Sequence, residues 1–235
     1  FNLVLRFQMT RVAVMQPYAF PYLGYIQLMH AVDHYIFLND VSWRKKGWIN
    51  RNTLKDGYKF TIPVQNASQN KTIKETIISV GWAEKFKKTI YHKYKNAPYF
   101  VDFRDDVSFV IDNMEGAEFS KATETAVTNL AHICGVRTNY NFSAEIEEFA
   151  NADFSSLKTE KKIKRICEHL KADTYINAIG GKDLDFYTPE FFNPIKLRFL
   201  KPKFELPSTS ILDLLFTYGP KRIRIELDKY ELIEK

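Results

Sequence analysis

The most constraining feature of this sequence is an apolar strand, a loop, a helix and a second apolar strand that follow one another. Residues 12–15 form a short apolar run, and residues 16–22 form a loop with two prolines. Residues 23–32 place apolar side chains at near-helical spacing. Residues 35–38 are wholly apolar, as expected of a strand in a buried parallel sheet. A strand–helix–strand unit of this kind implies a right-handed crossover and an α/β fold.

The rest of the chain predicts a hairpin, a group of helices and a return to alternating strands and helices. Asp56-Gly57 indicates a hairpin turn between residues 49–54 and 58–64. Further strands are expected at residues 71–79, 136–142, 173–176 and 195–200, and helices at residues 82–94, 100–114, 118–134, 159–170 and 210–218, the last closed by Gly219-Pro220. This order predicts a single α/β domain at residues 9–235, with a Rossmann-like parallel sheet core and a helical insertion at about residues 82–134.

Composition excludes several classes of protein. The 235 residues carry a net charge of +6, with 45% hydrophobic and 15% aromatic residues, so the chain is not disordered. No apolar run reaches the roughly 18 residues of a membrane span. Cys134 and Cys167 form neither a disulfide framework nor a Cys-x-x-Cys zinc pair, which favours a reduced, cytoplasmic protein. Residues 1–8 are interpreted as an expression-tag remnant ahead of Met9.

Loops at the carboxyl ends of parallel strands hold ligands in α/β proteins, so residues 16–22 and 39–47 matter most. The first loop leads into a helix start, where free N–H groups favour an anion, and Gly24 permits a close approach. Tyr22-Leu-Gly-Tyr25 is similar in placement to the His-x-Gly-His signature of the nucleotidylyltransferase superfamily. A tyrosine can donate a hydrogen bond to phosphate but carries no positive charge. Packing of this aromatic loop over the sheet is the alternative.

The second loop combines a carboxylate, cations and tryptophans. Asp40 follows the second strand and could bind a hydroxyl, a metal or an amine, or act as a base. Arg44 and Arg51 could hold phosphate or carboxylate in a bidentate manner, and a local Asp–Arg pair is the alternative. Trp43 and Trp48 flank the basic residues, which suits stacking on a base or a sugar. The lysine-rich residues 158–165 are interpreted as a solvated helix face.

Other chemistry is not indicated by the sequence. The five histidines are scattered and predict no metal site: His30, His34, His92, His132 and His169. The sequence contains no Walker loop, no nucleophile elbow and no G-x-G-x-x-G motif, and it identifies no cofactor. Residues 177–181 predict either a plain tight turn or a second phosphate-binding turn.

Several stretches together resemble the WbqC-like protein family: residues 12–25, Asp40-Val41, residues 47–52, 95–100 and 174–181, and Ser210-Ile-Leu-Asp213. The family is bacterial, and its name comes from genes of surface-polysaccharide (O-antigen) assembly. The resemblance implies a set of site residues: Gln16, Pro21, Gly24, Tyr25, Asp40, Trp48, Asn50, Arg51 and Asp213. The link from the strand near Phe199 to Ser210 is shorter than is usual in the family.

These observations lead to two main hypotheses. The first is a transferase acting on a nucleotide-linked or otherwise activated small substrate, with Asp40 and Arg51 as catalytic residues. The substrate would carry phosphate or carboxylate and would contact Gln16, Tyr22, Gly24, Tyr25, Arg44, Trp48, Asn50 and Asp213. The second is a non-catalytic sugar- or partner-binding protein of a polysaccharide assembly. A nucleic-acid-binding module is disfavoured, because the net charge is modest and acidic residues interleave with the lysines.

Overall fold

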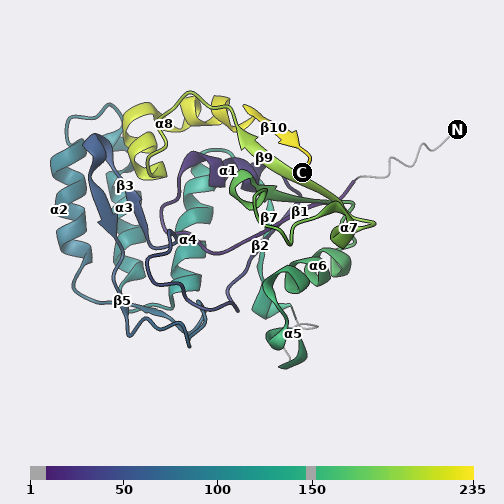
Figure 1. The fold of residues 1–235 in the computed structure, drawn as a ribbon. Coiled ribbons are helices and arrows are strands. Elements are labelled where there is room, and N and C mark those ends of the chain that lie inside the picture. Colours follow the sequence, from purple (N-terminus) through teal and green to yellow (C-terminus); the bar gives the residue numbers. More distant parts are fainter. Residues whose placement is uncertain (1–8, 147–151) are drawn as a thin grey trace, which may run out of the picture.

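The computed structural model describes residues 9–146 and 152–235, and a six-stranded sheet forms its centre (Figure 1). From one edge to the other the strands are β10 (Tyr230–Ile233), β9 (Lys196–Pro202), β8 (Thr174–Ala178), β1 (Arg11–Met15), β2 (His34–Phe37) and β7 (Asn139–Phe142). Neighbouring strands are parallel except for β10, which runs antiparallel to β9. The parallel core expected from the sequence is confirmed. The expected tag remnant lies outside the described residues.

The alternation of side chains along the strands gives the sheet two apolar faces, and helices cover both. Ala13 and Tyr35 face the cluster that contains α1 (Leu23–His30) and α8 (Ile211–Leu227). Val12 and Ile36 face the opposite way, toward α6 (Thr159–His169), α7 (Pro189–Phe192) and Phe154 of α5 (Ala152–Ser156). The three layers are visible in Figure 1, where α8 and α5–α7 lie on opposite sides of the strands.

The helical insertion lies between β2 and β7 and occupies the left of Figure 1. Its helices are α2 (Ala83–Tyr94), α3 (Phe100–Met114) and α4 (Phe119–Ile133), close to the predicted ranges. The predicted hairpin is also confirmed, because β3 (Arg51–Thr53) pairs with β4 (Lys59–Thr61) around the turn Lys55–Gly57. The insertion packs into the same apolar cluster as α1 and α8.

The strand predicted at residues 71–79 is wrong for most of its length. Within this range only β6 (Ile77–Ile78) forms a strand, which pairs with β5 (Val64–Gln65), and Thr72 makes a single isolated bridge with Ser42. Upstream, the Glu75 carboxylate accepts hydrogen bonds from the backbone N and the Oγ1 of Thr72, both at 2.7 Å. Such local side-chain hydrogen bonds favour a turn over an extended strand.

The predicted helix end at Gly219-Pro220 is only a break in α8. Gly219 takes a φ of 72°, and a Cβ there would lie 2.6 Å from the Tyr99 ring. Pro220 then starts a second helical run, where its fixed φ fits and its missing N–H costs nothing. The helix therefore continues to Leu227 and leads into β10.

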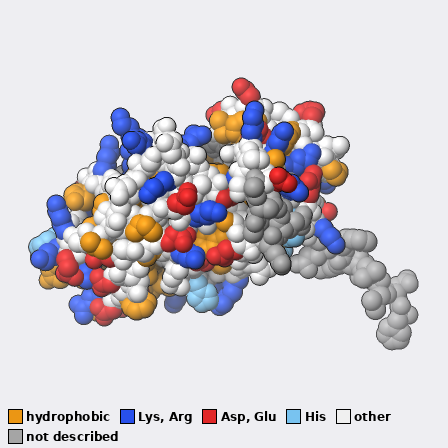
Figure 2. Space-filling model, turned by 90° about the horizontal axis from the view of Figure 1, so that it is seen from below, with side chains coloured by type: hydrophobic (Ala, Val, Ile, Leu, Met, Phe, Trp, Pro, Cys, Tyr) orange, Lys and Arg blue, Asp and Glu red, His pale blue; other side chains and the backbone are white. Residues whose placement is uncertain are grey.

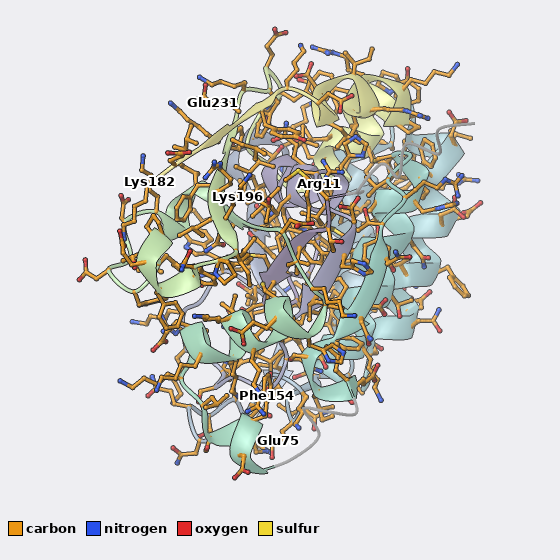
Figure 3. All side chains as sticks on the ribbon, turned by 90° about the vertical axis from the view of Figure 1, so that its right-hand side faces the viewer. Arg11, Glu75, Phe154, Lys182, Lys196 and Glu231 are labelled. Carbon is orange, nitrogen blue, oxygen red and sulfur yellow. The ribbon has the colours of Figure 1, made fainter. Side chains whose placement is uncertain are left out.

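The order of the strands determines where a ligand site can form. The chain leaves β1 toward β2 on one side and later reaches β8 on the other, which is the arrangement of doubly wound α/β folds. Arg11 and Lys196 begin β1 and β9, and Figure 3 shows both near the centre of the side facing the viewer. The carboxyl ends of these strands, including the switch point between β1 and β8, therefore lie on the far side.

Candidate functional site

A pocket of about 1100 Å³ opens at this switch point. Its walls come from the end of β1 with residues 16–22, α1, Leu38 after β2, residues 44–53, the first two turns of α6 with Lys158, the end of β8 with the turn Ile179–Gly181, residues 184–187, and Ser208. Concave, largely apolar sites of this size at a switch point are typical small-molecule sites.

The structure brings half of the predicted site residues into this pocket. Gln16, Tyr22, Tyr25, Arg44 and Trp48 line it. Gly24, Asp40, Asn50, Arg51 and Asp213 are not among its lining residues. The short link before Ser210 contributes Ser208 to the wall.

The aromatic loop forms one wall and is held by hydrogen bonds from its own hydroxyls. Tyr25 donates to the carbonyl of Gln16 at 2.8 Å, and Tyr18 donates to the carbonyl of Arg51 at 3.1 Å. The rings of Tyr18 and Tyr25 meet edge to face, with centroids 5.7 Å apart. Burial raises the pKa of Tyr18 to about 12 and also raises the pKa of Tyr22 and Tyr25. These phenols are therefore neutral hydrogen-bonding groups near neutral pH.

The neighbouring wall carries the exposed tryptophan that the sequence singled out. Trp48 is 68% exposed, and the guanidinium of Arg51 lies 5.0 Å from its ring centroid. Arg51 also donates to the backbone carbonyl of Lys46. Arg51 thus supports one face of the indole, and exposed Arg44 lines the pocket beside it. Trp43 differs from the expectation, because it is 3% exposed and packs against Phe119 in the core.

The opposite wall was recognised from the sequence only at residues 177–181, where a phosphate-binding turn was one of two interpretations, and not at the start of α6. Lys158, Thr159 and Glu160 line the pocket from the start of α6, and Asn177 lines it from β8. The helix that precedes a parallel strand begins at the carboxyl edge of the sheet, where ligands bind. The predicted order of helix and strand therefore indicated that the start of α6 lies near the site.

Asp40 lies just outside the pocket in a buried cluster. Its Oδ2 pairs with Lys162 Nζ at 2.7 Å, and its Oδ1 accepts a hydrogen bond from Ser143 at 2.6 Å. Lys162 also donates to the Asp40 carbonyl at 2.8 Å. Because Lys162 is 3% exposed, the solvated-face interpretation of residues 158–165 is wrong for this residue. The pair joins the end of β2 to α6, whose first turn lines the pocket.

The other three predicted residues have local structural contacts. A Cβ on Gly24 would lie 2.4 Å from the Tyr22 ring, so the close approach at Gly24 is made by that side chain. Asn50 donates to the carbonyl of Ile62 at 2.9 Å, next to the hairpin. Asp213 accepts a hydrogen bond from Tyr94 at 2.9 Å and so connects α8 with α2.

Three observations on the described residues concern metal donors, the cysteines and membrane-spanning helices. Within residues 9–146 and 152–235, no group of three or more His, Cys, Asp or Glu side chains is placed to hold a metal ion. Cys134 and Cys167 are both buried, and burial raises the pKa of each thiol. No helix in the described part of the chain is long and apolar enough to cross a membrane.

Comparison of the sequence with known proteins identifies relatives and a family. The chain is 26% identical over 229 residues to the uncharacterised protein Rv1507c of Mycobacterium tuberculosis, a match that covers 90% of this chain and 95% of the relative. No solved structure gives a significant match. Residues 16–225 match the WbqC-like protein family, and they contain nearly every segment that lines the pocket. The chain belongs to the WbqC-like protein family.

Proposed function

We propose that this protein is a cytoplasmic transferase that acts on a nucleotide-linked or otherwise activated small substrate in bacterial surface-polysaccharide (O-antigen) biosynthesis. The observation that carries the proposal is the combination of Trp48, Arg44 and Lys158 on the walls of one large pocket. An exposed indole supported by Arg51 suits stacking on a flat ring, and two cations suit a phosphate or a carboxylate.

The residues of the pocket then take separate roles. Arg44 and Lys158 hold the anionic group, and Trp48 stacks on the ring. Glu160, a half-buried carboxylate on the first turn of α6, is placed to take a proton from an acceptor. Asp40 acts as a positioning residue through Lys162, and Arg51 acts as one through Trp48.

The anion is assigned to the cations rather than to Tyr22-Leu-Gly-Tyr25. Tyr25 is 4% exposed, and its hydroxyl hydrogen is used by the Gln16 carbonyl. A contact with phosphate in the manner of nucleotidylyltransferases is thus left to Tyr22 alone. Gln16 and Tyr22 remain available on the wall to bind the uncharged parts of the substrate.

The surface charge on the face shown in Figure 2 favours a small ligand over a nucleic acid. On the face shown in Figure 2, basic and acidic side chains are interspersed over most of the surface. Nucleic-acid binding would instead require a continuous basic surface and would weaken steeply with salt.

The second candidate function is a non-catalytic sugar- or partner-binding protein. It is favoured by the scarcity of acid–base groups, because Glu160 is the one carboxylate and no histidine occurs among the described residues that line the pocket. Replacement of Glu160 distinguishes the two functions. A transferase with Glu160→Gln keeps its ligand affinity and loses turnover, whereas a binding protein shows no turnover even in the wild type.

Calorimetry with nucleoside diphosphates and nucleotide sugars tests the proposed function. We expect Arg44→Gln and Trp48→Ala each to weaken binding by about tenfold or more. Arg165→Gln and Phe109→Ala are matched controls, because both residues are exposed outside the pocket, Phe109 as strongly as Trp48 at 68%. The absence of binding by every probe to the wild-type protein would contradict the proposal.

A further inference from the structure

The pocket has two parts that differ in exposure. Its mouth is formed by exposed side chains: Arg44, Trp48, Lys158 and Phe186. Its inner part is formed by buried polar and aromatic side chains that are 4% to 8% exposed: Tyr25, Asn52, Asn177 and Tyr187. A ligand that fills the pocket therefore meets two chemically different environments.

All charge on the pocket wall lies near the mouth. Among the described lining residues, only Arg44, Lys158 and Glu160 are charged, and none of the three is buried. The inner phenols add no charge, because burial raises the pKa of both Tyr25 and Tyr187. Among the described lining residues, the inner part thus presents no cation that could pair with an anion.

The lack of a cation in the inner part of the pocket determines which chemical group of a ligand can bind there. A carboxylate or phosphate buried without a partner loses its hydration and gains no compensating charge. A hydroxyl group, in contrast, can exchange hydrogen bonds with amides and phenols at little cost.

The amide of Asn177 illustrates how the inner part is built for neutral groups. Its Oδ1 accepts a hydrogen bond from the backbone N of Ala178 at 2.8 Å. Its Nδ2 lies across Gly181, where an added Cβ would come within 2.4 Å of the nitrogen. The amide orientation is therefore fixed by its own backbone, and glycine leaves it the necessary space.

We propose that the inner part receives an uncharged, hydroxylated group such as a neutral sugar, while the anion of the same substrate stays at the mouth. The inference rests on the proposed function and defines its substrate class. Substrates whose inner group is a sugar acid are excluded, because a second carboxylate would be buried away from Arg44 and Lys158.

Paired nucleotide sugars that differ only in this charge test the inference. The probes are UDP-glucose with UDP-glucuronate, UDP-galactose with UDP-galacturonate, and GDP-mannose with GDP-mannuronate, each with its free nucleoside diphosphate. We expect the neutral member of any pair that binds to bind about tenfold or more tightly than the acid. Equal affinities, or a preference for the acid, overturn the inference. If no probe binds, the proposed function fails and the inference fails with it.

A charge added inside the pocket gives a second test. Gln16 lines the wall at the end of β1, so Gln16→Lys places an ammonium there. We expect this variant to reduce or reverse the preference for the neutral sugar. Gln65→Lys adds the same charge at an exposed position of β5 outside the pocket and should keep the wild-type preference. An unchanged preference in a folded Gln16→Lys protein that still binds the nucleotide overturns the inference.

Discussion

Asp40 and Asp213 are two carboxylates that the sequence placed in one site, and the structure separates them. Both are buried, at 7% and 5% exposure. Asp40 is neutralised by the ammonium of Lys162 at 2.7 Å. Asp213 has no such ion pair among the described residues. Instead it lies in the first turn of α8 and accepts a hydrogen bond from the phenol of Tyr94 at 2.9 Å.

The difference between them concerns what each carboxylate connects. Asp40 joins the sheet to α6 and so fixes a wall of the pocket. Asp213 joins α8 to α2 and is not a lining residue, and its charge is favoured by the amino end of its helix. Disruption of the Asp40 contacts should therefore weaken ligand binding as well as stability. Loss of the Asp213 carboxylate should lower the free energy of unfolding without changing ligand affinity.

The largest effect is expected from breaking the Asp40–Lys162 pair on one side. Lys162→Met leaves the Asp40 charge buried without its partner, and we expect the free energy of unfolding to fall by about 3–5 kcal/mol. Urea unfolding measures this loss. The double variant Asp40→Asn/Lys162→Met removes both charges and should recover most of it. A loss below about 1 kcal/mol in the single variant would show that the pair is not desolvated.

A smaller effect is expected from Asp213→Ala. This variant leaves the buried Tyr94 hydroxyl without its acceptor, and we expect a loss of about 1–3 kcal/mol. Nucleotide affinity, measured by calorimetry on the folded protein, should stay at the wild-type value, whereas Lys162→Met should weaken it. Equal loss of affinity in the two variants would contradict the separation of roles.

Alkaline pH should weaken the contact between Tyr94 and Asp213, because it favours loss of the Tyr94 proton. Burial, and then the charge of Asp213, raises the pKa of Tyr94 far above its usual value. The unfolded chain therefore releases this proton first, so stability is complete below about pH 10 and falls as the pH rises further. Tyr94→Phe should cost about 1 kcal/mol at neutral pH and should make that fall less steep. Urea unfolding between pH 8 and about 11 measures both slopes, and identical slopes would refute the assignment.

The smallest losses of stability are expected from removing the hydroxyl groups that donate the remaining hydrogen bonds to Asp40 and Asp213. Ser143 donates to Asp40 at 2.6 Å, whereas Thr217 donates to Asp213 at 3.4 Å. We expect Ser143→Ala to cost about 1 kcal/mol and Thr217→Val to cost less than about 0.5 kcal/mol. Thermal unfolding of both variants measures these losses. A larger loss of stability for Thr217→Val than for Ser143→Ala would contradict the prediction.

The sequence predicted those parts of the molecule that depend on local pattern. The apolar strands and the helices of the insertion follow from side-chain periodicity, and the turn at Asp56-Gly57 follows from glycine chemistry. The strand predicted at residues 71–79 failed because Glu75 caps Thr72 locally, a contact that alternating apolar residues do not reveal.

Only half of the predicted site residues line the pocket, and the wall formed by the start of α6 was missed because its position depends on tertiary contacts. Lysines dominate residues 158–165, and their density favoured a solvated face. Lys162 nevertheless lies four residues before Ile166, on the same stripe as the buried Ile163 and Cys167. That position was a local signal for burial. Its partner Asp40 lies 122 residues away in the chain, and no local pattern connects the two residues.

The exposure of Trp48 also has a spectroscopic consequence. Trp43 is 3% exposed and Trp82 is half-buried, whereas Trp48 is 68% exposed at the mouth of the pocket. A soluble quencher such as iodide therefore reaches the indole of Trp48 far more readily than that of Trp43. A ligand that stacks on Trp48 shields it and shifts its emission to shorter wavelength. The chain thus carries an intrinsic fluorescent reporter of pocket occupancy, with the buried Trp43 as an internal reference.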